Sequence, residues 1–313
     1  MKHYRILLVF GLVIFLSGCW DETPIDDRSF VIGSALDKAE EGIGETNRIT
    51  LTNQFVIPSK ISNPGQMSGG SSEQKAYENL SVTGQSAFQI SREMLSLTNR
   101  IPNYEHLQIL IVSPEIARDP DYFSSVLDSF IRDHEIRREI KVIISDGDAS
   151  ELLNVRTETE DIPARFIDTI LENNIKSLEL IDPVTIGLVH QYLLDDNSYL
   201  IPSISLMEGN INYDGVAVFD GKSDQQVGTL KGEDIQGYKL IEGKIKNGAL
   251  TFYIDNKLMI YEISDAKSTI NINTANPEDI KISIAIDTEG PSPKCTEVNH
   301  FWINPILMIL RKV

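Results

Sequence analysis

The period of the apolar residues changes along this sequence, and that change constrains the fold more than any other feature. Helical spacing and buried-type strands alternate through the first half, at residues 86–98, 107–112, 121–132, 140–145 and 162–174. The strongest helical stripe is that of residues 121–132, where Tyr122, Val126 and Phe130 repeat every four positions. This alternation predicts a sheet with helices packed on it.

Beyond residue 200, the chain reads almost entirely as short strands. Ile280, Ile282, Ile284 and Ile286 alternate with less apolar neighbours, a pattern typical of a half-buried strand with one wet face. The other strand-like pieces are residues 215–219, 226–230, 238–245, 250–253, 258–263 and 270–273. We therefore predict an α+β protein with a boundary at 195–202. A sheet-and-helix N-terminal domain (19–200) would precede a smaller, mostly antiparallel, β-rich C-terminal domain (201–313).

The first twenty residues have the pattern of an export signal. Lys2 and Arg5 precede an apolar run that is too short to span a bilayer, and small residues follow it. The sequence Leu16-Ser17-Gly18-Cys19 resembles the bacterial lipobox, whose cysteine thiol receives a diacylglycerol. We predict a signal peptide over 1–18 and a lipid on Cys19. Two acyl chains would hold the chain firmly on a membrane.

The negative net charge excludes one class of binding partner. The formal net charge is −18, and such a surface repels phosphate backbones, so we expect no nucleic-acid partner. The chain has two cysteines, and lipidation of Cys19 would leave Cys295 without a partner in the chain. A disulfide scaffold is therefore not expected.

The sequence offers no arrangement typical of catalysis or metal binding. His134 lacks a second histidine one helical turn away, as a metalloprotease helix needs. Residues 146–150 look like half of a calcium loop, but Thr157 stands where the bidentate glutamate belongs. A turn followed by a helix cap at Asp148 explains the same residues. We therefore predict no enzyme activity, no cofactor and no metal.

A cluster of charged residues lies at the junction between the predicted helix 121–132 and the next predicted strand, 140–145. Its members are Arg132, His134, Glu135 and Arg137. One interpretation is a helix end at which basic side chains interact favourably with the negative end of the helix dipole, and this effect by itself slightly favours that interpretation. The other interpretation is a contact surface for a partner protein, and these four residues are our candidates for it.

Several segments, in order and at matching spacing, resemble the Ger(x)C (GerAC-like) family of spore germination lipoproteins. The resemblance runs from the signal peptide to about Asp287 and is longest at Phe130-Ile131-Arg132-Asp133-His134-Glu135-Ile136-Arg137-Arg138. The other pieces are Gly18-Cys19-Trp20-Asp21, Phe30-Val31-Ile32-Gly33, 92–100, His106-Leu107-Gln108, 145–149, Gly215-Val216-Ala217-Val218-Phe219, and the glycines Gly228, Gly232 and Gly237.

This resemblance implies a specific role. Members are the C subunits of spore nutrient germinant receptors, anchored by lipid at the outer face of the spore inner membrane. They assemble with a larger A subunit and a transporter-like, multispanning B subunit, and no catalysis is attributed to them. The resemblance also implies an α+β fold with a separate C-terminal domain.

The chain departs from the family pattern at its end. Members usually continue with an amphipathic helix and a final strand, whereas residues 291–313 contain only a short apolar stretch, 301–310. One hypothesis is an incomplete C-terminal domain; the other is a divergent terminus that packs as one buried element. A chain ending at Asp287 would separate them, because loss of a packed element lowers the melting temperature.

Two other functions compete with the receptor subunit. A solute-binding lipoprotein would capture a small nutrient at the outer face of the membrane, and it would need a polar and aromatic cleft between two similar lobes. The two halves here look unlike each other, and aromatic residues make up only 7%. An extracytoplasmic hydrolase would need a nucleophile and a base, which the sequence does not reveal.

Overall fold

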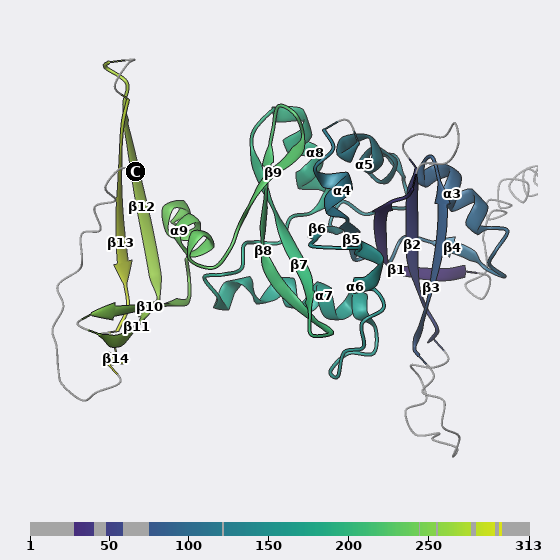
Figure 1. Cartoon of the computed structure of the whole chain (residues 1–313), viewed down its shortest axis with the longest axis horizontal. Coiled ribbons are helices and arrows are strands. Elements are labelled where there is room, and N and C mark those ends of the chain that lie inside the picture. The colour runs from purple at the N-terminus through teal and green to yellow at the C-terminus, as the bar shows by residue number, and fades with distance from the viewer. Residues whose placement is uncertain are drawn as a thin grey trace, which may run out of the picture.

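One large mixed sheet organises most of the protein (Figure 1). The computed structural model describes residues 28–40, 48–58, 75–120, 122–243, 245–254, 256–276, 280–291 and 294–295. Cys19 and the apolar stretch 301–310 lie outside these ranges. The nine-stranded sheet has the order β3-β2-β1-β5-β6-β7-β8-β9, and β4 pairs separately with β1.

The middle of this sheet is parallel and both of its margins are antiparallel. The parallel strands are β1 (Arg28–Lys38), β5 (Ile109–Val112), β6 (Lys141–Ser145) and β7 (Tyr199–Met207), together with β4 (Ile101–Asn103) beside β1. The antiparallel strands are β2 (Ile49–Val56) and β3 (Tyr77–Gly84) at one margin, and β8 (Asn210–Asp220) and β9 (Gln225–Leu230) at the other.

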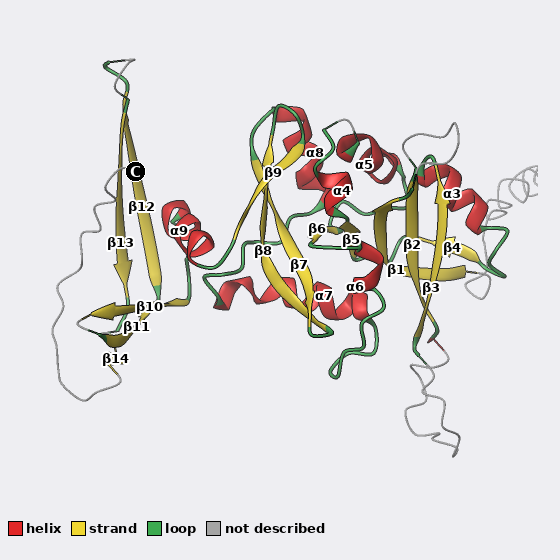
Figure 2. Ribbon diagram, viewed as in Figure 1, coloured by secondary structure: helices red, strands yellow, loops and turns green. Residues whose placement is uncertain are grey.

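Helices cover both faces of the parallel strands, as the crossovers between such strands require (Figure 2). One face packs against α3 (Ala87–Met94), α5 (Phe123–Arg132) and α8 (Ile186–Asp195). The other face packs against α6 (Ala149–Leu152) and α7 (Pro163–Leu171). The short helix α4 (Pro114–Ala117) follows β5, and a 3-10 turn, η2 (Glu172–Lys176), follows α7.

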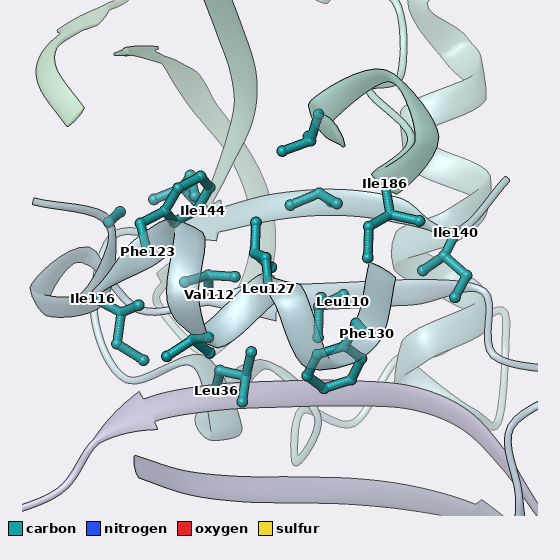
Figure 3. Packing of buried hydrophobic residues seen from close by; sticks show 14 of the residues in the cluster. Leu36, Leu110, Val112, Ile116, Phe123, Leu127, Phe130, Ile140, Ile144 and Ile186 are labelled. Carbon is teal, nitrogen blue, oxygen red and sulfur yellow. The ribbon is translucent and has the colours of Figure 1, made fainter. Parts of the chain in front are cut away.

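The buried strands explain the continuous apolar runs in the sequence. Successive side chains of β5 point to opposite faces, so Leu110 and Val112 enter the core beneath α5, while Ile109 and Ile111 enter the core beneath α6 and α7. Figure 3 shows the first of these cores, where Phe123, Leu127 and Phe130 of α5 lie over the strands. The predicted sheet-and-helix region is confirmed.

The described residues beyond α9 form smaller antiparallel units. β10 (Gly248–Ile254), β11 (Lys257–Ile263) and β14 (Lys294–Cys295) make a three-stranded sheet, and β12 (Asp265–Asn273) pairs with β13 (Lys281–Glu289) in a two-stranded ribbon. This ribbon extends away from the rest of the molecule in Figure 1. The α+β class and the antiparallel character of this part are therefore confirmed.

One predicted strand is wrong. Residues 238–245 were expected to be a strand, but helix α9 (Glu233–Glu242) occupies most of that range and ends at Gly243, which takes the left-handed conformation with φ 69°. Ile235 and Lys239, four residues apart, are its buried positions. The prediction failed because the apolar residues of so short a segment fit both the helical period of 3.6 and the strand period of 2. In addition, a lysine is normally expected on the solvent side, so the buried position of Lys239 was not recognised.

The predicted boundary at 195–202 runs from the last residue of α8 into the first residues of β7. Strands β7, β8 and β9, which follow that boundary, pair within the large sheet. The division into domains stays a prediction, and we return to it in the Discussion.

Candidate functional site

The predicted charged cluster forms a loop between α5 and β6. Phe123, Val126, Leu127 and Phe130 bury one side of α5, so Arg132 at its end projects outward, with 79% of its side chain exposed. Its Nε lies 2.7 Å from Asp128 Oδ1, one turn earlier on the same helix. Solvent screens an exposed pair of this kind, so it contributes little to stability.

The loop after Arg132 is held by a hydrogen bond between one of its side chains and its own backbone. Asp133 Oδ1 accepts a hydrogen bond from the Glu135 amide at 2.9 Å, which closes a short turn. His134 at the tip of this turn has 93% of its side chain exposed, and its Nδ1 lies 3.7 Å from Asp133 Oδ1. The loop therefore presents an imidazole to solvent from a fixed turn.

The second half of the loop rests on helix α8. The Gly187 amide donates to the Arg138 carbonyl at 3.0 Å, and a Cβ at Gly187 would stand only 3.1 Å from that oxygen. Glycine at this position therefore allows the loop to approach the helix closely. Arg138 Nη1 donates to His190 Nδ1 at 2.7 Å, because a guanidinium has no acceptor.

The four predicted residues, neighbours in the chain, thus lie at the end of α5 and in the loop that follows it, and three of them, Arg132, His134 and Arg137, are exposed. Arg137 is exposed and has no hydrogen-bond or ion-pair partner within the described ranges. Glu135 is half-buried. The contact between Arg138 and His190 was not predicted, since it joins residues 52 positions apart and leaves no local signal. Chemically, the loop offers cations and an imidazole for docking.

A small cavity lies at the opposite end of β6. The charged loop comes directly before Lys141, whereas the cavity is lined by residues that follow the carboxyl end of β6 and by the end of β7. Its volume is about 170 Å³. Its lining residues are Ser145, Asp146, Gly147, Asp148, Glu151, Leu152, Ile204, Ser205 and Leu206. Ligand pockets usually measure roughly 300–1,000 Å³, so only a very small polar molecule would fit.

The helix that follows the half-loop of carboxylates beside this cavity is capped by a residue that the sequence did not indicate. Asp148 occupies the N-cap position of α6, but its side chain makes no capping hydrogen bond. Asp37, at the end of β1, caps the helix instead: its two carboxylate oxygens accept from the Ala149 amide at 2.6 Å and the Ser150 amide at 3.0 Å. Burial raises the pKa of Asp37, and the Ala149 hydrogen bond opposes that shift.

No group of three histidine, cysteine, aspartate or glutamate side chains is placed to hold a metal ion in the described part of the chain. Cys19, the predicted lipid site, lies outside that part. Among the helices that the structure describes, none combines the length and the apolar character that crossing a bilayer requires.

Comparison with known proteins covers nearly the whole chain. Residues 21–206 match the family described as spore germination protein N-terminal domain. Residues 214–299 match the family described as spore germination B3/GerAC like, C-terminal. The two matches follow each other in order and leave only a short gap between them.

Individual relatives agree with these matches. Spore germination protein YndF of Bacillus subtilis strain 168 is 31% identical over 303 residues, covering 91% of this chain and 74% of the relative. Spore germination protein A3 of the same strain is 28% identical, covering 91% and 73%. The crystal structure of the GerBC protein shares the fold, with a TM-score of 0.53 and 19% identity over 86% of this chain and 74% of that one.

Proposed function

Because this chain belongs to the GerAC-like family of spore germination proteins, we propose that it is a lipid-anchored, non-catalytic subunit of a spore nutrient germinant receptor. The observation that carries this proposal is the ordered match of both halves of the chain to the two families. The subunit would sit at the outer face of the spore inner membrane and assemble with a larger A subunit and a multispanning B subunit.

The lipid anchor is the first element of this proposal. Leu16-Ser17-Gly18-Cys19 supports it by residue type and by position after the apolar run. A diacylglycerol on the cysteine sulfur would place two acyl chains in the bilayer, at about 0.8 kcal/mol for each buried methylene. The formal net charge of −18 opposes adsorption to anionic lipids, so attachment would depend on this anchor.

The partner surface is the second element. Arg132, His134 and Arg137 project from the loop after α5, and the contacts of the loop to α8 restrict its conformations before a partner binds. A surface ordered beforehand loses less entropy on association. Glu135 beside them provides a carboxylate of opposite sign, so the loop can pair with both acidic and basic groups of a partner.

Capture of a nutrient by this subunit itself is the alternative. The cavity beside β6 is the feature that would serve it, but its volume of about 170 Å³ is small, and three carboxylates, Asp146, Asp148 and Glu151, line it. We therefore favour the receptor subunit over the solute-binding lipoprotein.

The anchor is tested by comparing wild-type protein with Cys19→Ser in a spore-forming host. Wild-type protein should be recovered in purified spore inner membranes together with a multispanning partner, and Cys19→Ser should lose both. Cys295→Ser is the matched control, because it removes the other cysteine and should behave as the wild type. A lipidated wild-type protein found alone, in growing cells, would favour the solute-binding alternative.

The partner surface is tested by the double substitution Arg132→Ala and Arg137→Ala. The protein should fold normally, because both side chains are exposed, while co-isolation of the partner should fall about tenfold or more. Arg118→Ala is the control: this arginine is also exposed but follows α4, at the carboxyl end of β5. Unchanged co-isolation in the double variant would remove the loop from the interface.

A further inference from the structure

The β12–β13 ribbon carries an unusually apolar face. In its antiparallel register Ile270 lies opposite Ile284, Ile272 opposite Ile282, and Ser268 opposite Ile286. Residues directly opposite each other project to the same face, so these isoleucines form one stripe. The other face is polar and carries Lys267, Thr269, Asn271, Lys281, Ser283 and Asp287. The ribbon is therefore amphipathic along its whole length.

Among the residues that the structure describes, only one end of the stripe is covered. Ala266, at the base of β12, is 3% exposed and packs in a small core with Leu178, Ile245 and Ile263, against which Leu240 of α9 also rests. Toward the tip the exposed fraction rises to 50% for Ile270, 61% for Ile272 and 63% for Ile282. The isoleucine face thus extends the small buried core at the base of the ribbon into a region that no described element covers.

We propose that this isoleucine face is the docking surface for the chain's own residues 301–310, Phe-Trp-Ile-Asn-Pro-Ile-Leu-Met-Ile-Leu. This segment has eight apolar residues among ten and no charge. The uncovered face is likewise aliphatic and uncharged, so docking would bury apolar surface of both the segment and the ribbon, which is favourable.

The geometry of the chain allows this contact. Strand β14 pairs antiparallel with β11, with Lys294 opposite Ile260 and Cys295 opposite Met259. The strand therefore runs away from Ile263 and the base of the ribbon, and the chain after Cys295 has to turn back to reach that base. Five residues lie between Cys295 and Phe301, and the six steps from one to the other reach about 20 Å when extended. Ten extended residues span about 33 Å, close to the ~30 Å length of a nine-residue strand.

A second copy of the chain fits this face less well. A two-stranded ribbon about 30 Å long and about 10 Å wide offers roughly 300 Å², whereas a stable interface needs ~800 Å² from each partner. A lipid surface also fits less well, because the protein has a formal net charge of −18 and anionic headgroups would repel it.

Thiol labelling of Ile272→Cys tests the proposal in the full chain, with Cys295→Ser as background and Cys19 occupied by lipid or replaced by serine. With the tail docked, maleimide should label this cysteine at least tenfold more slowly than in the same chain ended at residue 298. Asn271→Cys, on the polar face, is the matched control and should label equally in both chains.

A second comparison uses a variant of full length, so that the test does not depend on shortening the chain. Leu307→Asp with Ile309→Asp keeps the chain length and should restore fast labelling at Ile272→Cys. Equal labelling in the full chain, the shortened chain and this variant would overturn the proposal. Protection that grows with protein concentration would assign the face to a second copy, and protection that requires phosphatidylglycerol vesicles would assign it to lipid; either result overturns the proposal too.

Discussion

At the scale of single residues, the position of a carboxylate in space matters more than its place in the sequence. Asp148 stands where a capping residue is expected, yet its side chain is exposed and makes no capping bond. Asp37, 112 positions from Ala149, provides both acceptors for the free amides of α6. The cap therefore also ties the end of β1 to the helix that follows β6.

We expect Asp37→Ala to lower the free energy of unfolding by about 1–2 kcal/mol, because two helix amides lose their acceptor. Urea denaturation of the purified protein measures this change. Asp148→Ala is the matched control and should alter stability by no more than about 0.5 kcal/mol. The reverse order of the two effects would show that Asp148 caps the helix in solution.

At the scale of elements, a buried lysine of helix α9 connects two parts of the molecule. Lys239 is 8% exposed, and its Nζ donates to three carbonyl oxygens, of Asn174 at 3.1 Å, Ser177 at 2.8 Å and Leu180 at 2.7 Å. Burial lowers the pKa of this lysine. These bonds attach α9 to the segment that follows α7, and so attach the second part of the molecule to the first.

Replacing Lys239 by methionine keeps the unbranched side chain up to about the position of Cε but removes all three N–H donors. We expect the free energy of unfolding to fall by about 1–3 kcal/mol, since three carbonyls lose a partner at a buried position. Urea denaturation monitored by circular dichroism measures the loss. Lys246→Met, at an exposed position, should leave stability within about 0.5 kcal/mol. A Lys239→Met protein as stable as the wild type would contradict this role.

At the scale of the whole molecule, the large sheet continues beyond the predicted boundary. β7 joins the parallel strands through β6, and β8 and β9 extend the sheet to Leu230. Removal of these strands would expose the apolar side chains of Ile201, Val216 and Phe219, which are fully buried. We therefore propose that the N-terminal domain ends after β9.

Limited proteolysis tests this division. Brief digestion with a protease of broad specificity should yield a stable N-terminal fragment whose C-terminus, measured by mass spectrometry, lies between Lys231 and Gly248. A stable fragment that ends before Tyr199 would instead support the boundary at 195–202.

Local patterns predicted much of the fold. The helix at 121–132, the strands at 107–112 and 140–145, and the alternating isoleucines were all identified correctly as helix or strand. Each is a period of apolar residues within one segment, and such a period follows from backbone geometry alone. The four residues proposed as a contact surface are neighbours in the chain, so the sequence alone placed them in one segment, and their role stays a prediction.

The tertiary structure decided what depends on contact between distant segments. The cap from Asp37, the contact of Arg138 with His190, and the burial of Lys239 each join residues more than 50 positions apart. The isoleucine strand was expected to be half-buried, yet part of its apolar face is uncovered among the described residues. Alternation reports which side chains share a face, whereas only the arrangement of the other elements determines whether that face is covered.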